Sequence, residues 1–193
     1  MKELPELLTV DADAWRAWLD AHEGDPDGVW LRLTKKGFTE PTSLTYEAAL
    51  LEALCSGWID GQARRCDDRS SWQRFTPRRP RSRWSAKNVA RVEQLVDEGR
   101  MRVRGADEVT RAQADGRWDE AYAGAATIQP GQELLDALAG NPGGSAIFAT
   151  LGGSSRYAVI YRSSTPRTAA GRERAAARLV ARLERGEWPH QSP

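Results

Sequence analysis

The sequence predicts an α+β protein that is mostly helical, with a small antiparallel sheet in its N-terminal half and a helical C-terminal unit. Apolar residues recur at helical spacing in several segments, whereas alternation with period two marks the region around residue 30. The 193 residues are enough for one domain with a smaller appended unit. Small residues and the turn sequence IQPGQ separate a main domain over residues 1–125 from a helical unit over residues 126–193.

The first two elements are a helix and a strand. The segment DADAWRAWLDAH predicts a helix with Asp13 as its N-cap, and GDPDG ends it. The segment VWLRLTKKGF predicts a half-buried strand, because its apolar and polar residues alternate. Its two faces carry Val29, Leu31 and Leu33 on one side and Trp30, Arg32 and Thr34 on the other.

A helix with Thr45 as its N-cap and Gly57 at its end follows. Two short strands, WIDGQARRC and SSWQRFTP, are then predicted around a polar turn at residues 67–70, and the prolines at 77 and 80 indicate an extended arm. Further helices are expected from Ser85 to Gly99 and within residues 105–116. The C-terminal unit should contain a long helix from about Arg172 to Arg185.

Composition excludes several classes of protein. The net charge of +1 gives no overall attraction for anions, so such attraction requires local clustering. The two cysteines and two histidines, Cys55, Cys66, His22 and His190, show no metal-ligand spacing, and we expect neither a metal nor another cofactor. The N-terminus lacks a signal-peptide core and no apolar run is long enough to span a bilayer, so we expect a cytoplasmic protein without membrane contact.

The strongest functional signal is the segment RRCDDRSSWQRFTPRRPRSRWSAKN at residues 64–88. Nine of its residues are Lys or Arg and two are Asp, and it contains Trp72 and Trp84. Guanidinium groups bind phosphate or carboxylate in two places, and indole rings provide stacking surfaces. The predicted partner is therefore a small molecule or anion that is flat or negatively charged, sequestered in a pocket between the arm and the start of the next helix. The predicted ligand-binding residues are Trp58, Asp60, Arg74, Thr76, Arg78, Arg79, Trp84, Ser85 and Asn88.

Three alternatives remain open. The arginines could pair with acidic neighbours while the tryptophans are buried, and Asp60 could then be a partner of Arg64, Arg65 or Arg78. The same segment could bind single-stranded nucleic acid, although the low net charge argues against a dedicated binder. An enzyme that modifies a toxic small molecule would use Asp60 as acid or base and a cysteine as nucleophile; Cys66 lies among arginines, whereas Cys55 ends an apolar helix.

Longer motifs add a resemblance to a known family. The segments ALCSGWIDG, RFTPRRPRSRWSAKNVARVEQLVDEGRM and GADEVTRAQADGRWDEAY, with FATLGGSSRYAVIYR and RLERGEWPH further on, resemble the bacterial YdeI/OmpD-associated, or bacteriocin-protection, family. The resemblance extends over nearly the whole chain. It implies a role in antimicrobial resistance or stress response, with no assigned reaction, cofactor or catalytic residues.

One segment departs from the family pattern. Where members carry a stretch like AKKPETRARR before the last helix, this sequence has TPRTAAGRERAA at residues 165–176. The lysine pair is missing, and Arg172 and Arg174 supply part of the charge. If that element holds a ligand in the family, its binding properties differ in this protein.

Overall fold

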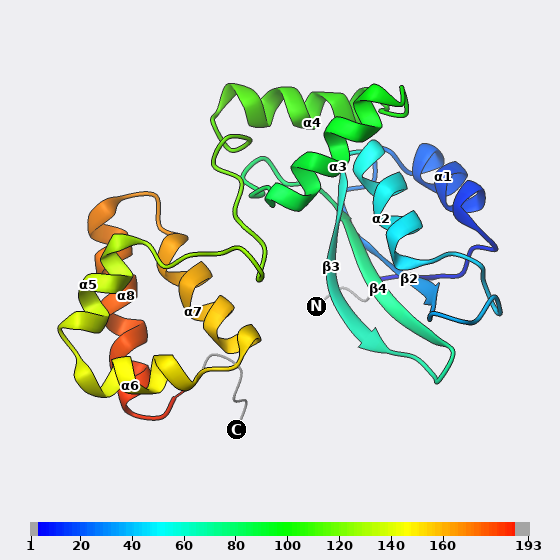
Figure 1. Cartoon of the computed structure of the whole chain (residues 1–193). Coiled ribbons are helices and arrows are strands. Elements are labelled where there is room, and N and C mark those ends of the chain that lie inside the picture. The colour runs from blue at the N-terminus through cyan, green and yellow to red at the C-terminus, as the bar shows by residue number, and fades with distance from the viewer. Residues whose placement is uncertain (1–3, 188–193) are drawn as a thin grey trace. The chain divides into compact units, whose positions relative to one another are not determined.

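A computed structural model describes residues 4–187 of the chain. The chain forms two compact units, Met1–Ala121 and Tyr122–Pro193 (Figure 1). Each unit has a hydrophobic core of its own. The first unit combines a sheet with helices, and the second is helical, so the predicted fold class is confirmed.

The first unit contains a four-stranded mixed sheet with strand order β1-β2-β4-β3. Its strands are β1 (Glu6–Leu7), β2 (Val29–Thr34), β3 (Trp58–Arg65) and β4 (Ser70–Pro77). The pairings of β2 with β4 and of β3 with β4 are antiparallel, as predicted, whereas the short edge strand β1 runs parallel to β2. An irregularity between Asp60 and Ala63 shifts the register of β3 against β4.

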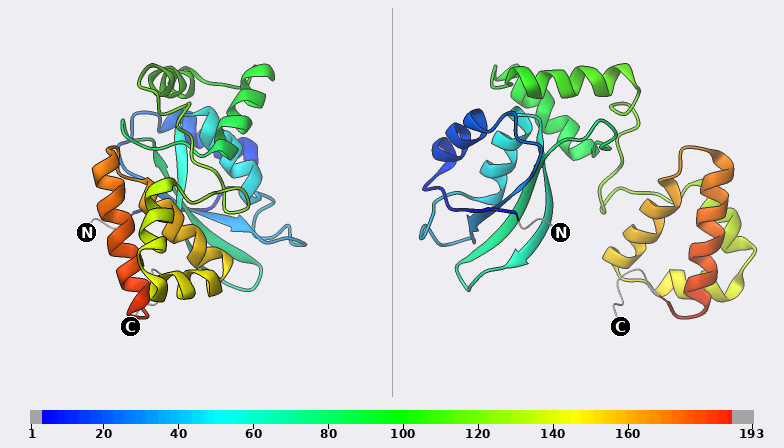
Figure 2. Two further views of the ribbon diagram at one scale, coloured as in Figure 1. Left: turned by 60° about the vertical axis from the view of Figure 1, so that its left-hand side comes forward. Right: turned by 180° about the vertical axis from the view of Figure 1, so that it is seen from behind.

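Helices α1 (Ala12–Ala21) and α2 (Tyr46–Cys55) cover one face of this sheet. Figure 2 shows both helices on the same side of the strands. The alternation in β2 sends Val29, Leu31 and Leu33 into the core, where each is at most 2% exposed. Trp15 packs there against Phe75 of β4, with ring centroids 5.5 Å apart. This apolar layer orients β2 and β4, so that the alternate side chains of these strands lie on the opposite face.

Helices α3 (Ala86–Asp97) and α4 (Val103–Ala114) complete the first unit. Ser85 caps α3 as predicted, because its hydroxyl accepts a hydrogen bond from the Asn88 amide at 3.1 Å. Val92 and Leu95 of α3 and Ala112 of α4 join the core of the sheet. The backbone of α4 passes very close to the end of α2, where Gly105 leaves room for the Cys55 carbonyl.

The second unit consists of α5 (Gln132–Ala139), α6 (Pro142–Thr150), α7 (Gly153–Ser164) and α8 (Ala169–Glu184). Helix α8 packs against each of the other three. Its inner face presents small and aliphatic residues to them, including Ala176, Val180 and Leu183, each at most 1% exposed. Small side chains allow the helices to approach closely, whereas the arginines of α8 lie toward the outside.

The predicted elements differ from the observed ones in a few places. Asp11, and not Asp13, caps α1, since its carboxylate accepts from the Ala14 amide at 2.9 Å. A carboxylate must lie before the first helical residue to reach this amide, whereas Asp13 is already inside the helix. Helix α4 begins at Val103, two residues before the predicted boundary at 105, and α8 begins at Ala169, three residues before Arg172.

Candidate functional site

The face of the sheet opposite α1 and α2 carries aromatic and basic side chains. We call this surface the basic sheet face; it consists of Trp30, Arg32, Arg64, Trp72, Arg74 and Thr76. Strand register brings these residues together, because Trp30 lies opposite Arg74, and Trp72 lies opposite both Arg32 and Arg64. Trp30 and Trp72 remain partly exposed, whereas their neighbours Leu31 and Phe75 are fully buried. The apolar core on one face therefore determines which side chains the other face presents.

Arg64 is the central cation of the basic sheet face. Its guanidinium carbon lies 4.4 Å from the centroid of the Trp30 ring and 5.5 Å from that of Trp72. Both distances are within the range of cation–π attraction. Arg64 also forms an ion pair with Glu6 of β1, which is 54% exposed. Exposed ion pairs contribute little free energy, so an incoming anion can replace the Glu6 carboxylate at small cost.

Arg74 is the cation of this face that lacks a hydrogen-bond partner at its inner nitrogen. Its Nε is buried and makes no hydrogen bond within the described residues. By contrast, Arg32 donates from Nε to the Ser70 hydroxyl at 2.9 Å and pairs with Asp67, so it holds the β3–β4 turn. A buried donor without an acceptor costs free energy, so the observed Arg74 conformation is held at a cost that a change of its side-chain conformation would recover.

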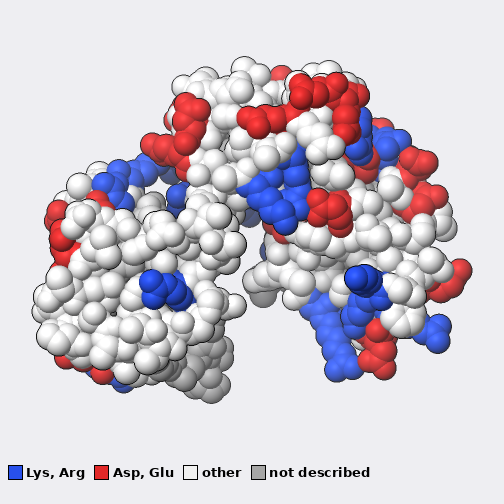
Figure 3. Space-filling view, viewed as in Figure 1, with Lys and Arg blue, Asp and Glu red and all other residues white. Residues whose placement is uncertain are grey.

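Acidic side chains accompany the basic ones at the end of the β3–β4 hairpin. On the face shown in Figure 3, Lys and Arg side chains gather around the free end of this hairpin, next to Asp and Glu side chains. Asp67 accepts from the Ser70 hydroxyl at 2.8 Å and from the amides of Arg69 and Ser70 at 2.9 and 2.7 Å. These hydrogen bonds hold the pKa of the Asp67 carboxyl far below its usual value. The ionised Asp67 carboxylate therefore fixes the conformation of the β3–β4 turn, which is a structural role.

The nine residues predicted to line one pocket lie in three places. Arg74 and Thr76 belong to the basic sheet face. Trp58 is fully buried on the helix face of the sheet, where its ring meets Trp18 edge-on at 5.8 Å. Asp60 accepts a hydrogen bond from the Tyr46 hydroxyl at 2.8 Å, so its observed partner is a tyrosine and none of the three arginines considered from the sequence.

The remaining five predicted residues surround the connection between β4 and α3. Arg78 is 4% exposed, and its guanidinium carbon lies 3.5 Å from the centroid of the buried Trp84 ring. Ser85 caps α3, and Asn88 is 8% exposed and accepts from Arg91 at 3.0 Å. Arg79 is exposed, and its backbone amide donates to the Ser82 hydroxyl at 3.1 Å. Arg78 and Trp84 thus do meet, as an inward-facing stacked pair.

Sequence reasoning missed Trp30 and Arg32 as site residues; Arg64 and Trp72 lie in the segment that it singled out, but they were not among the predicted ligand-binding residues. Their signal was present in the alternation of β2, which places Trp30 and Arg32 opposite the buried leucines. Extending the same period-two count through β4 places Trp72 and Arg74 on one face and Gln73 and Phe75 on the other. Treating residues 64–88 as a single cluster obscured this separation.

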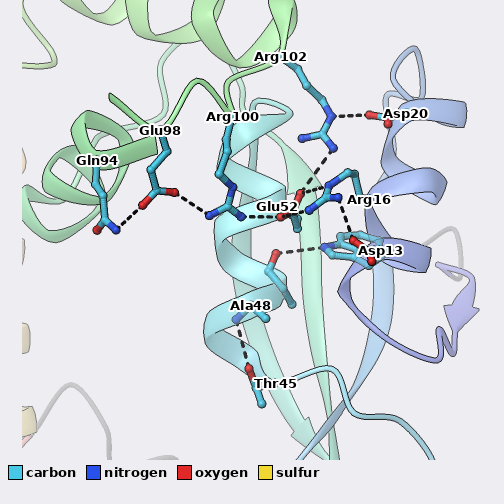
Figure 4. Close-up of polar contacts among 12 residues, drawn as sticks. Asp13, Arg16, Asp20, Thr45, Ala48, Glu52, Gln94, Glu98, Arg100 and Arg102 are labelled. Carbon is cyan, nitrogen blue, oxygen red and sulfur yellow. Dashed lines mark hydrogen bonds and ion pairs between the residues drawn. The ribbon is translucent and has the colours of Figure 1, made fainter. Parts of the chain in front are cut away.

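A second polar cluster lies on the helix side of the first unit, around Glu52 (Figure 4). The Glu52 side chain is 3% exposed. Its carboxylate accepts hydrogen bonds from Nε and Nη2 of Arg16, each at 2.9 Å, and from Nη2 of Arg100 at 2.6 Å. Arg102 lies 3.5 Å from the same carboxylate and bonds Asp20 at 2.5 Å. Burial alone would raise the pKa of Glu52, but the hydrogen bonds from Arg16 and Arg100 outweigh it, and the pKa lies below its usual value. This cluster ties α1, α2 and the α3–α4 connection together.

The cysteines do not form a redox pair. Both thiols are free; Cys55 is fully buried at the end of α2, and Cys66 is partly exposed beside the β3–β4 turn. Burial, reinforced by the charge of Glu52, raises the pKa of the Cys55 thiol. An apolar environment that disfavours the thiolate makes Cys55 a poor nucleophile, as its position in the sequence predicted.

The described residues contain neither a cluster of metal ligands nor a helix able to cross a membrane. Within residues 4–187, no three His, Cys, Asp or Glu side chains are placed to hold a metal ion together. No helix in that range combines the length and apolar character that crossing a bilayer requires. The expectation concerning His190 falls outside the described residues.

Two family models match the chain. Residues 7–108 match a domain of unknown function, DUF8412, and residues 130–186 match the family described as bacteriocin-protection, YdeI or OmpD-associated. No curated protein and no solved structure matches the chain. The resemblance stated from the sequence is thus confirmed over α5–α8, but the motifs between Trp58 and Asn88, which carried much of it, lie in the other match. Because the first model covers more than half of the residues, the chain belongs to the DUF8412 family, and residues 130–186 of its C-terminal unit are similar to the bacteriocin-protection, YdeI or OmpD-associated family.

Proposed function

We propose that this protein is a protection protein that binds a flat anionic molecule on the basic sheet face and acts by sequestration in the cytoplasm. The observation that carries the proposal is the position of Arg64 over Trp30 and near Trp72, with Arg74 on the adjacent strand. A bound anion would take the place of Glu6 on Arg64 and pair with the charge of the partly exposed Arg74 side chain. The flat part of the ligand would stack on an exposed indole face.

The match to a bacteriocin-protection family supports the biological part of the proposal. Sequestration lowers the free concentration of a toxic molecule by mass action, without any reaction. Two indole rings and two adaptable guanidinium groups favour ligands that combine an aromatic ring with a carboxylate, sulfonate or phosphate. Such a site needs no enclosed cavity, because the stacking surface and the charges lie on one sheet face.

Calorimetric titration with naphthalene-2-sulfonate tests the proposal, since this probe has a flat ring and one fixed charge. Arg74→Gln and Trp72→Ala should each weaken binding by about fivefold or more, because each removes roughly 1 kcal/mol or more of contact. Arg79→Gln removes the same charge from an exposed position outside the basic sheet face and serves as the matched control. Equal affinities for all four proteins would refute the proposal. Mass spectrometry of the recovered ligand separates sequestration, which leaves its mass unchanged, from an enzymatic modification.

Single-stranded nucleic acid is the second candidate ligand. It is favoured by one observation, the presence of two partly exposed tryptophans beside three arginines on a sheet face. Successive bases stack on such rings while arginines contact phosphates. Fluorescence anisotropy of a labelled 12-nucleotide oligomer should then show affinity that falls steeply with salt and is weakened by Trp72→Ala. No binding in 50 mM salt would exclude this candidate.

A further inference from the structure

The second unit contains a cavity whose polar lining is made of arginine alone. It has a volume of about 290 Å³ and lies between α7 and α8. We call it the α7–α8 arginine pocket; its lining residues are Arg162, Ala175, Arg178, Leu179 and Arg182. No acidic residue is among them. The pocket differs in this from the basic sheet face, where Arg64 and Arg32 form ion pairs with Glu6 and Asp67.

Helix geometry explains how three arginines come to line one pocket. Arg178 and Arg182 are four residues apart on α8 and therefore project from the same side of that helix. Arg162 comes from the last turn of α7, which packs against α8. Ala175 is 6% exposed and, together with Leu179, forms the apolar part of the wall. Apolar and basic residues alternate along α8, so the pocket has an apolar wall next to three arginines.

Neighbouring acids leave most of this charge uncompensated. Among the described residues, the guanidinium groups of Arg162 and Arg178 have no hydrogen-bond or ion-pair partner. Arg182 lies 3.3 Å from Glu187, but that carboxylate is shared with Arg185 at 2.9 Å. Over residues 122–187 the unit has eight arginines, no lysine and five acidic residues. Like charges gathered around one cavity repel one another, so a bound anion would lower the electrostatic energy of the three arginines.

We propose that the α7–α8 arginine pocket binds the phosphate group of a small phosphate monoester. A phosphate dianion presents three equivalent oxygens, which three guanidinium groups can each contact in a bidentate manner. A carboxylate offers two oxygens and a single charge, and therefore satisfies fewer of these donors. The apolar wall of Ala175 and Leu179 receives the first carbon atoms of the ester. This site lies on the second unit and does not depend on the function proposed for the basic sheet face.

The proposal is tested on the full chain with inorganic phosphate as the probe, by following the arginine side-chain N–H signals in NMR titrations. We expect saturable shifts with millimolar affinity. Arg162→Gln and Arg178→Gln should each weaken binding by about tenfold or more, because each removes a bidentate charge-assisted contact. Arg174→Gln removes the same charge from the same helix but not from the pocket lining, and it should change the affinity by less than about twofold. Arg178→Lys keeps the charge without the planar fork and should fall between the wild-type protein and Arg178→Gln.

Two further probes identify the source of the phosphate. Phenyl phosphate should bind more tightly than inorganic phosphate if the apolar wall contacts the ester, whereas phosphatidic acid vesicles, compared with phosphatidylcholine vesicles, report on a lipid headgroup. Tighter binding of either phenyl phosphate or phosphatidic acid vesicles supports a phosphate site, and the tighter of the two identifies the source as a soluble ester or a lipid headgroup. Shifts that do not saturate by about 50 mM phosphate, an affinity far weaker than three bidentate contacts provide, would overturn the proposal. An equal loss of affinity in Arg174→Gln would also overturn it, because net charge alone would then explain binding.

Discussion

Replacement of Glu52 by Gln should destabilise the first unit strongly, although it changes a single oxygen into an amide nitrogen. The side chain is 3% exposed and accepts two hydrogen bonds from Arg16 and one of 2.6 Å from Arg100. In the variant, donors of the new amide face donors of the guanidinium groups, and Arg16 and Arg100 each lose the buried one of their two carboxylate partners, while Asp13 and Glu98 remain at the surface. Breaking a buried ion pair costs about 3–5 kcal/mol; because Arg16 is 42% exposed and water can replace part of its contacts, we expect about 2–4 kcal/mol here.

Urea unfolding followed by tryptophan fluorescence measures this loss. Seven of the eight tryptophans lie in the first unit, so the signal reports on the unit that contains Glu52. With a urea dependence of about 1–3 kcal/mol per molar, the midpoint should fall by roughly 1–2 M. Glu98→Gln is the matched control, because Glu98 also bonds Arg100, at 3.0 Å, but at the surface, and its midpoint should stay near that of the wild-type protein.

The pH dependence gives a second test of the same reasoning. The folded-state pKa of Glu52 is lowered, so its stabilising contribution is complete above the unfolded-state pKa and is lost as the pH falls through the folded-state value. The difference in unfolding free energy between wild type and Glu52→Gln should therefore be constant from about pH 6 to pH 8 and shrink below about pH 4, near and below the carboxyl pKa of an unfolded chain. A midpoint unchanged at pH 7, or a difference that grows in acid, would refute this account of the cluster.

Two other predictions concern the contact between α2 and α4 and the thiols. Gly105→Ala would place a Cβ 2.1 Å from the Cys55 carbonyl oxygen, a backbone atom that cannot rotate away. The gain in helix propensity of about 1 kcal/mol is outweighed by overpacking, and a net loss of roughly 2 kcal/mol is expected in the same urea assay. Gly24→Ala, in open space within the first unit, should leave the midpoint unchanged, and equal midpoints for both variants would contradict the close approach. In the native protein at pH 8, a colorimetric thiol reagent should modify Cys66 rapidly, and should modify Cys55 only after urea is added, because Cys55 is buried and burial raises its pKa. Rapid reaction of both thiols would show that the end of α2 opens in the native state.

The local patterns of the sequence predicted most elements because each pattern reflects a local physical constraint. Alternation in Val29–Thr34 was sufficient to assign both faces of β2, and the hydroxyl groups of Thr45 and Ser85 marked two helix starts. The parallel pairing of β1 was not predictable, because a strand of two residues is too short to show an alternation of apolar and polar residues. Its register is set only when the rest of the sheet has formed. The same is true of Glu52, whose three partners come from α1 and from the connection after α3. Sequence spacing carries no information about such distant pairings.

The candidate site was predicted in chemistry but not in geometry. Arginine and tryptophan do meet repeatedly in residues 64–88, yet Arg64 approaches Trp30 and Trp72 on the open face, while Arg78 stacks on Trp84 toward the interior. A strand reverses the direction of its side chains at every residue, so a segment rich in two residue types divides them between two faces. Composition identifies the groups present, but strand register decides which of them can act on one ligand.

The two hydrophobic cores share no residue, and the stretch that separates the two family matches, residues 109–129, contains the boundary between them. A recombination event within that stretch would leave every member of the helical bundle on one fragment. The bundle of α5–α8 can thus be exchanged as one fragment without dividing either core. On this view, related genes should include some in which the bundle follows a different N-terminal sequence, with its own arginines retained.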